Sequence, residues 1–404
     1  MSPKPHQKRH LRVASSSNLN TIMIRSSVAA AAAAFIGSAS AMTCTNITVP
    51  VDLSARNGVF NVKAPQNNIE VTNFILDNTQ QGTNYSAAVL EEYKTVSGHY
   101  ELAATYCVPG DGHSSERPKI LQILTHGIGF DRSYWNLPFN SGNYSYSAVA
   151  TDEYRYATFS WDRLGIGMSS HGDPVQEIQA LLEVDGLRAL TEGLRDGCIE
   201  GVDDEFEKIV HVGHSFGSTH TYALTAMYPD ISDGIALTGF SQNGSFVPYF
   251  MLGGNFIDVK ENAALAPLYD HGYLASANPS AVQTNFFAPG TFDPEILTFA
   301  ATTGQPVTIG ELLTIGGETG SPNPFAGPVF IITGERDVPF CGGSCLNGAP
   351  SGSSIPAQAQ EFFTKSNITT TIVPGAGHGL NLEYSHPFTY KSINDFFVAK
   401  LGKP

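Results

Sequence analysis

Nine residues decide the fold of this chain: Ile209-Val210-His211-Val212-Gly213-His214-Ser215-Phe216-Gly217. They join a short apolar run, typical of a buried strand, to a stretch from about Ser215 to Tyr228 with a helical composition. Gly213 and Gly217 flank Ser215 at the two positions where a sharp strand-to-helix turn leaves no room for side chains. Such a turn puts the hydroxyl at a helix N-terminus, where free N–H groups favour negative charge. In that context we predict a nucleophilic serine rather than a structural one.

A serine hydroxyl is a weak nucleophile unless a base takes its proton, and His378 is the predicted base. It lies in Pro374-Gly375-Ala376-Gly377-His378-Gly379, directly after the last predicted strand. His386 is the alternative, but it stands beside Pro387 at the start of the final predicted helix. The chain order Ser, Asp, His, which is typical of nucleophile elbows, favours His378.

The base in turn needs a carboxylate that fixes its tautomer and stabilises its charged form. Asp337 follows a predicted strand, within Gly334-Glu335-Arg336-Asp337. Glu335 is the competitor because it is closer to the end of that strand. The other common place for the acid is empty, because an earlier strand is followed by Ser241-Gln242-Asn243-Gly244, which has no carboxylate. We therefore predict Asp337 as the acid.

Acyl transfer also needs N–H donors that point at the developing oxyanion. One predicted donor is the backbone N–H of Phe216, next to Ser215. The other is the backbone N–H of Ile128, in Thr125-His126-Gly127-Ile128-Gly129-Phe130 at the end of an earlier predicted strand. The glycines of this segment let the backbone approach a substrate closely. A purely structural turn is the alternative interpretation.

Short apolar runs alternate with helical stretches from residue 120 to the end of the chain. This alternation predicts a parallel sheet that is covered by helices on both faces. The predicted strands are residues 120–124, 156–161, 209–213, 234–239, 329–333 and 369–373, and the predicted helices are residues 178–194, 215–228 and 387–401. Residues from about 52 to 108 instead look like β-strands with turns, which predicts a β-rich N-terminal extension.

Residues 241–327 break this alternation and are rich in Gly, Pro, Phe, Tyr and Asn. We expect helical pieces near Asn262–Leu268 and Ile309–Leu313. A long insertion at the sheet edge where active-site loops gather predicts a cap, and an irregular excursion without a role in the pocket is the alternative. The core then consists of residues 42–240, with the extension, and residues 328–404. The side chains of the cap that could line the pocket, or else fill the interior, are Phe246, Tyr249, Phe250, Met251, Phe256, Tyr269 and Tyr273.

The first 41 residues have the pattern of a secretory signal peptide. They contain five Lys or Arg and no Asp or Glu, and an apolar run from Val28 to Ile36 is followed by the small residues Gly37–Ala41. This pattern predicts cleavage before Met42 and secretion. A membrane anchor is the alternative, but the apolar run is too short to span a bilayer comfortably. Met23-Ile24-Arg25 would itself begin a compact signal peptide and is an alternative start.

The whole chain has a net charge of −15, and removal of the leader leaves 17 Lys and Arg against 37 Asp and Glu, or −20. Such a surface repels phosphate backbones and anionic lipids. We therefore expect no nucleic-acid partner and no membrane anchoring after cleavage. The balance favours a neutral or weakly polar small-molecule substrate.

Sequons and cysteines fit an oxidising, exported environment. The five glycosylation candidates are Asn46, Asn84, Asn143, Asn243 and Asn367. Cys341 and Cys345 flank a Gly-rich loop that could close as a disulfide. Half of a zinc site is the alternative there, although no second ligand pair has suitable spacing. Among Cys44, Cys107 and Cys198 the sequence leaves the pairing open.

Together these motifs resemble those of the α/β-hydrolase superfamily, in its branch with a His-Gly oxyanion motif and a cap. The chain is also similar to secreted fungal enzymes of this type. The resemblance implies the α/β-hydrolase fold, an α/β class with a mostly parallel central sheet, flanking helices and a cap insertion. Epoxide hydrolases and haloalkane dehalogenases of this branch have Asp at the nucleophile position, so Ser215 argues against both chemistries. The resemblance covers residues 100–401 and rests on His126-Gly127-Ile128-Gly129, residues 162–169, the Ser215 elbow, residues 334–337 and His378.

The residues and the resemblance predict a secreted serine hydrolase that cleaves small-molecule carboxylic esters with the triad Ser215, Asp337 and His378. No metal and no organic cofactor is expected. A peptidase or a carbon–carbon bond hydrolase would use the same triad, and the substrate could belong to secondary metabolism. A non-catalytic binding protein on this fold is the alternative from another class, but such proteins usually lose a triad residue and none is lost here.

Overall fold

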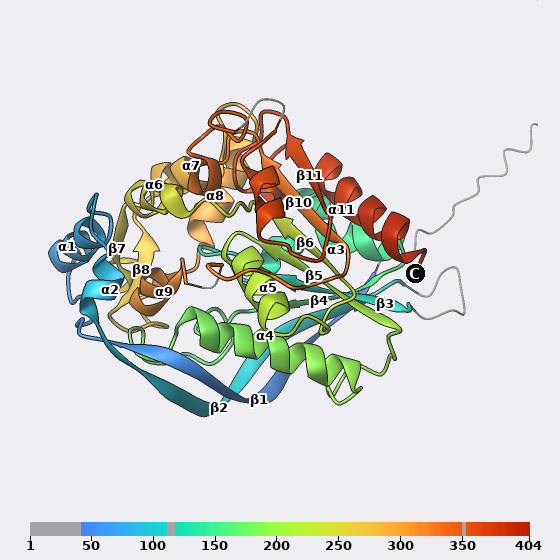
Figure 1. The fold of residues 1–404 in the computed structure, drawn as a ribbon, viewed down its shortest axis with the longest axis horizontal. Coiled ribbons are helices and arrows are strands. Elements are labelled where there is room, and N and C mark those ends of the chain that lie inside the picture. The colour runs from blue at the N-terminus through green and yellow to red at the C-terminus, as the bar shows by residue number, and fades with distance from the viewer. Residues whose placement is uncertain (1–41, 111–117, 318, 350–352) are drawn as a thin grey trace, which may run out of the picture. The chain divides into compact units, whose positions relative to one another are not determined.

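The computed structural model describes residues 42–110, 118–317, 319–349 and 353–404, so the predicted signal peptide, residues 1–41, lies outside the described residues. An eight-stranded sheet in the order β1-β2-β4-β3-β5-β6-β10-β11 forms its centre (Figure 1). The strands from β4 to β11 in that order are parallel, whereas β2 is antiparallel to both β1 and β4. The six parallel strands are β3 (Ile120–Thr125), β4 (Ala157–Trp161), β5 (Lys208–His214), β6 (Gly234–Thr238), β10 (Val329–Gly334) and β11 (Ile368–Val373).

The central strands β3, β4, β5, β6 and β10 are buried on both faces, which explains why they are apolar runs rather than alternating patterns. Val210 and Val212 of β5 belong to the same hydrophobic cluster as Phe397 of the last helix. Ile209 belongs to the cluster on the other face, together with Leu187. The flanking helices are α3 (Tyr146–Ala148), α4 (Ala180–Arg195), α5 (Phe216–Met227), α10 (Val338–Cys341) and α11 (His386–Leu401). The predicted fold, a parallel sheet between helices, is confirmed.

The N-terminal extension is a long antiparallel pair, β1 (Thr43–Phe60) and β2 (Leu90–Val108), with α1 (Asn68–Asn78) and α2 (Tyr85–Val89) between the two strands. The prediction of strands and turns alone for this region is therefore wrong where the helices lie. Asn67 caps α1, because its side-chain oxygen accepts the N–H groups of Ile69 and Glu70 at 3.1 Å each. The spacing of Asn67 and Glu70 is a capping signal that the sequence carries.

The insertion between β6 and β10, the predicted cap and here called the cap, has regular structure of its own. Its antiparallel sheet has the strand order β7-β8-β9. The expected helix near Ile309 is present, whereas residues 262–268 form consecutive turns. The Asn262 side chain accepts the N–H groups of Ala264 and Leu265, and Pro267 disfavours helical backbone at the residue before it. The elements are α6 (Val247–Gly253), β7 (Phe256–Asp258), β8 (Tyr273–Ser276), α7 (Pro279–Phe286), α8 (Pro294–Thr302), β9 (Val307–Thr308) and α9 (Ile309–Thr314).

Two disulfides are present. Cys341 and Cys345 are joined, as the loop between them suggested. Cys44 and Cys107 stand opposite each other in the β1–β2 register and are also joined, which leaves Cys198 exposed and outside any disulfide. In the ranges that the structure describes, no helix combines the length and the apolarity that a bilayer crossing requires.

Candidate active site

Ser215 occupies a strained turn between β5 and α5. Its φ is +55°, in the region that non-glycine residues rarely adopt, and its N–H donates to Thr238 O at 2.9 Å. A Cβ on Gly213 would lie 2.3 Å from the carbonyl oxygen of Gly217, and a Cβ on Gly217 would lie 2.3 Å from that of Thr125. The two glycines are therefore required by close backbone contacts, as the sequence pattern predicted.

Asp337 and His378 are brought together from two loops that follow neighbouring parallel strands, β10 and β11. The Nδ1 atom of His378 lies 2.6 Å from Oδ2 of Asp337, and both side chains are fully buried. Asp337 is held in turn, because its Oδ1 accepts the N–H of Phe340 at 2.8 Å at the start of α10. The Nε2 atom of His378 makes no hydrogen bond with any described residue. His378 Nε2 and Ser215 Oγ are therefore not hydrogen-bonded to each other in this structure.

Glu335 and His386, the alternatives for the predicted acid and base, form other contacts. Glu335 Oε2 accepts the N–H of Gly375 at 2.9 Å, on the loop that leads to His378. His386 places its Nδ1 2.8 Å from the carbonyl oxygen of Glu383 and packs against Tyr144. Of the candidate residues, Asp337 and His378 are therefore the pair that is hydrogen-bonded to each other.

The elbow lies beside this pair. The imidazole of His214, the residue before Ser215, has its centroid 4.8 Å from that of His378. Burial lowers the pKa of His214 well below its ordinary value, and the neighbouring His378 and His126 lower it further. Tyr134 stacks on the other side of His214, with a centroid distance of 4.4 Å. His214 is therefore a neutral, packed ring that supports the site and does not compete for protons.

The segment that follows β3 lies directly against Ser215. A Cβ on Gly127 would lie 2.7 Å from Cβ of Ser215, so only glycine fits. His126 shapes this segment, because its Nδ1 donates to Gly127 O at 2.8 Å and its Nε2 accepts the N–H of Arg163 at 3.0 Å. Burial lowers the pKa of His126 well below its ordinary value, which keeps this arrangement neutral. Ile128 and Phe216 both line the same cavity as Ser215, and among the described residues no hydrogen bond occupies either backbone N–H.

Ser215 opens into a cavity of about 360 Å³, here called the catalytic cavity. Its described lining includes no Asp, Glu, Lys, Arg or His, so it suits an uncharged group. Of the cap side chains proposed as lining, Phe250 reaches this cavity, whereas Tyr249 is exposed and Phe256, Tyr269 and Tyr273 are interior residues. The main apolar lining residues are Ile128, Phe216, Val247, Phe250, Ile315, Pro339, Phe340 and Phe362.

Two buried acidic groups near the site were not foreseen from the sequence. The first is Glu383, whose Oε2 accepts the N–H of Gly377 at 2.8 Å, next to His378. Its Oε1 accepts the N–H of Ala288 at 2.6 Å and the hydroxyl of Thr291 at 3.0 Å, both in the cap. Burial raises the pKa of Glu383 to about 7 despite these hydrogen bonds. Glu383 therefore ties the loop of the predicted base to the cap.

The second is Glu311, part of a fully buried ionic cluster. The Arg163 guanidinium pairs with both Glu183 of α4 and Glu311 of α9, and His220 of α5 lies 3.3 Å from Glu183. Arg163 also lies over the ring of Phe216, at 4.9 Å. Burial raises the pKa of Glu311 to about 7, against the lowering effect of Arg163. The cluster fixes the cap helix α9 to the core directly beneath the elbow.

The predicted glycosylation residues differ in exposure. Asn46, Asn84, Asn143 and Asn367 are exposed, whereas Asn243 is half-buried and lines the catalytic cavity. Modification itself stays a prediction for all five.

Comparisons with known proteins agree with this architecture. The model of the family described as "Alpha/beta hydrolase family" matches residues 122–389. A thermophilic esterase from Thermogutta terrifontis is 16% identical, with 75% of this chain and 94% of that chain covered and a TM-score of 0.50. Epoxide hydrolase A from Mycobacterium thermoresistibile is 16% identical, with coverages of 74% and 94% and a TM-score of 0.46. The enol-lactonase from Burkholderia xenovorans is 15% identical, with coverages of 74% and 97% and a TM-score of 0.46.

A search of curated protein sequences gives no match. At 16% identity the Thermogutta terrifontis esterase bears on the fold alone. The family match, in contrast, spans more than half of the chain and includes the Ser215 elbow, Asp337 and His378. The chain therefore belongs to the alpha/beta hydrolase family.

Proposed function

We propose that this protein is a serine hydrolase that cleaves carboxylic esters through an acyl-enzyme. The observation that carries the proposal is the buried Asp337–His378 hydrogen bond of 2.6 Å beside a serine held at positive φ. A carboxylate, an imidazole and an elbow serine in this order are the groups that acyl transfer requires.

In the proposed first step, Ser215 Oγ attacks the ester carbonyl and its proton passes to Nε2 of His378. Asp337 keeps Nδ1 of His378 protonated and stabilises the imidazolium that forms. The backbone N–H groups of Ile128 and Phe216 are the proposed donors to the oxyanion. Collapse of the tetrahedral intermediate releases the alcohol, which takes the proton from His378.

In the second step, water attacks the acyl-Ser215 ester while His378 accepts its proton. The acid leaves, and the proton returns to Ser215. The uncharged lining of the catalytic cavity supports a neutral ester as substrate.

We further propose that the protein is exported after removal of residues 1–41. Two disulfides and four exposed sequons support this proposal, since disulfides persist in oxidising compartments.

The test of the catalytic proposal is Ser215→Ala, assayed with p-nitrophenyl acetate and with a matched aminoacyl p-nitroanilide. We expect the wild-type protein to cleave the ester and the variant to lose this activity while its circular dichroism spectrum stays unchanged. Ester turnover by Ser215→Ala at the wild-type rate would contradict the proposal, and a preference for the anilide would favour a peptidase.

A further inference from the structure

A second and larger hollow adjoins the catalytic cavity. It has a volume of about 610 Å³ and is here called the second chamber. The two spaces share four lining residues, Gly244, Val247, Ile315 and Gly316. Gly244 and Gly316 are exposed, and a Cβ at either would meet no atom within 4 Å, so this part of the boundary is open to solvent. The two spaces therefore meet at a boundary formed by these four residues.

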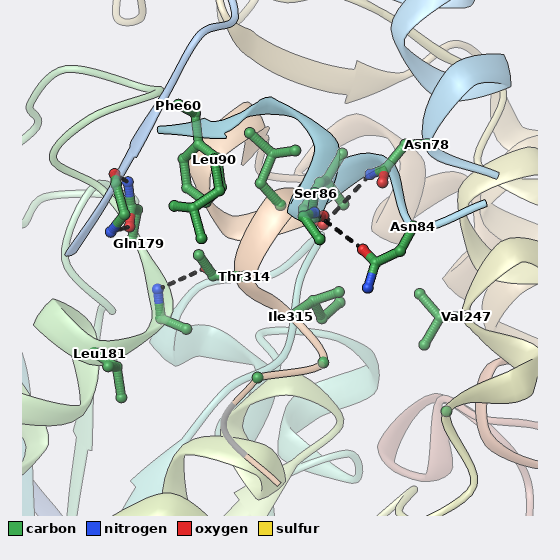
Figure 2. A pocket seen from close by; sticks show the side chains of 18 of the residues that line it. Phe60, Asn78, Asn84, Ser86, Leu90, Gln179, Leu181, Val247, Thr314 and Ile315 are labelled. Atoms are coloured by element: carbon green, nitrogen blue, oxygen red, sulfur yellow. Dashed lines mark hydrogen bonds between the residues drawn. The ribbon is translucent and has the colours of Figure 1, made fainter. Parts of the chain in front are cut away.

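The walls of the second chamber come from parts of the chain that are far apart in sequence. Figure 2 shows Phe60, Ser86 and Leu90 of the N-terminal extension in the upper part of the view, and Val247 and Ile315 of the cap below them. The extension precedes residue 122, where the family match begins. This wall is consequently supplied by a segment outside the part of the chain that the family model matches.

Two polar side chains that line the second chamber, Gln179 and Thr314, are hydrogen-bonded within the protein, and Asn78, Asn84 and Ser86 also line it. Gln179 accepts the N–H of Gly58 at 2.9 Å and donates to its carbonyl oxygen at 2.8 Å. Thr314 donates to Gly310 O at 2.8 Å and accepts the N–H of Ala180 at 3.1 Å. What remains for a ligand is mainly hydrophobic surface, and the apolar lining includes Phe60, Leu90, Val247, Met251, Leu312 and Leu313.

The described residues that line the two spaces include far fewer charged side chains than the acidic chain as a whole. Among the described lining residues of both, the single charged side chain is Arg56, which is exposed and lies 4.8 Å from the ring centroid of Tyr93. The chain has 37 acidic residues, yet no carboxylate is among the described lining residues of either space, so these residues offer no ionic partner to a cationic ligand. The combined space lies within the range typical of sites for small organic ligands.

We infer that the second chamber holds a long apolar arm of the ester substrate, which reaches it from Ser215 between Val247 and Ile315. The inference rests on the proposed esterase function and adds the substrate class: esters with an extended alkyl or ring-containing part. The arm is either the acyl or the alcohol side of the ester. Each methylene that leaves water for the apolar wall raises kcat/KM by about two- to fourfold.

The experiment compares chain-length series in the wild-type protein and in two neighbouring variants of α2. Ala87 lines the second chamber, whereas Ala88 does not, and both are exposed. Ala87→Trp puts a ring against the space, and Ala88→Trp is the matched control. Gly316→Phe narrows the shared boundary as a second, independent obstruction. One series is p-nitrophenyl acetate, butyrate, octanoate and dodecanoate, and the other is ethyl, butyl, octyl and dodecyl acetate.

We expect kcat/KM of the wild-type protein to rise along at least one series, which identifies the side of the ester that enters the chamber. Ala87→Trp and Gly316→Phe should lower the ratio of longest to shortest substrate at least about tenfold, and Ala88→Trp should keep the wild-type ratio. Thermal unfolding of all three variants checks that they fold.

If the wild-type protein hydrolyses the short esters but its kcat/KM does not rise along either series, the inference about the second chamber is overturned and the proposed function stands. The inference is also overturned if kcat/KM rises along a series but Ala87→Trp and Gly316→Phe keep the wild-type ratio of longest to shortest substrate. Equal losses of this ratio in Ala87→Trp and Ala88→Trp would overturn it as well. Absence of all ester hydrolysis would overturn both proposals.

Discussion

Ser215, Asp337 and His378 lie in loops that follow buried parallel strands, whereas the second chamber is enclosed by the cap and by residues 56–93 of the extension. The first group lies within the family match, and the wall from the extension lies outside it. The proposed chemistry and the proposed selectivity are thus carried by different segments of the chain. Substitutions in one region should alter turnover of all esters, and substitutions in the other should alter the choice among them.

The largest effect is expected at the proposed acid. Asp337→Asn keeps the shape of the side chain but disfavours the His378 tautomer that can accept a proton from Ser215. We expect kcat to fall about 10⁴-fold for short and long esters alike. The matched control is Glu335→Gln, since Glu335 contacts the Gly375 N–H and not His378. Equal losses in the two variants, measured with p-nitrophenyl butyrate, would contradict the assignment of Asp337.

The next effect concerns the ionic cluster that joins the cap to the core. Glu311→Ala leaves Arg163 buried with one carboxylate, and we expect the free energy of unfolding to fall by about 3–5 kcal/mol. Denaturant titration measures this loss. Glu295→Ala, at an exposed position of the cap helix α8, should change the value by no more than about 0.5 kcal/mol. A small effect of Glu311→Ala would show that the cap is anchored by other contacts.

Glu383 tests whether the cap also positions the base. Glu383→Gln weakens the contact with the Gly377 N–H, so His378 is held less firmly. We expect kcat to fall about 10- to 100-fold with little change in KM, because a small misplacement of a catalytic group is costly. Glu361→Gln, at an exposed residue, is the control. A rise in KM with unchanged kcat would assign Glu383 to substrate binding instead.

The same residue predicts a pH dependence of stability. Burial raises the pKa of Glu383 from 4.5 to about 7, so the folded chain holds more protons than the unfolded chain between these values. Its contribution therefore lowers the free energy of unfolding as the pH rises through that window, by at most about 1.4 kcal/mol per pH unit. Buried His211 and His214 have lowered pKa values and act in the opposite direction.

Because these groups act in opposite directions, the test compares how the free energy of unfolding changes with pH in two proteins. The free energy of unfolding is compared at about pH 5 and about pH 7.5 for the wild-type protein and Glu383→Gln. From the lower to the higher pH, the free energy of unfolding of Glu383→Gln should fall less, or rise more, than that of the wild-type protein. Identical slopes in the two proteins would show that Glu383 does not titrate in this window.

The smallest effect concerns glycosylation of the exported protein. Asn46, Asn84, Asn143 and Asn367 are exposed, so we expect glycans there, whereas Asn243 faces the catalytic cavity and should stay unmodified. Mass spectrometry of tryptic peptides with and without enzymatic deglycosylation gives the occupancy of each site. A glycan on Asn243 of the active protein would contradict the position of this residue in the cavity lining.

The strands and the elbow could be predicted because their signals are local. Apolar runs and the Gly213–Gly217 spacing follow directly from burial and from backbone contacts of 2.3 Å. The role of Glu383 could not be found in this way, because its partners Ala288 and Gly377 meet only in the folded chain. The second chamber was missed for the same reason, since residues 56–93 and 312–317 are far apart in sequence. Residues 262–268 show that helical composition is overridden by an Asn turn and a proline.

The central claim is that Ser215 is the activated nucleophile of this fold. The most direct measurement is reaction with a fluorophosphonate probe followed by peptide mass spectrometry. We predict one adduct, on Ser215, that is absent in Ser215→Ala and strongly slowed in His378→Ala. An adduct on another residue, or no adduct on a folded protein that hydrolyses esters, would contradict the claim.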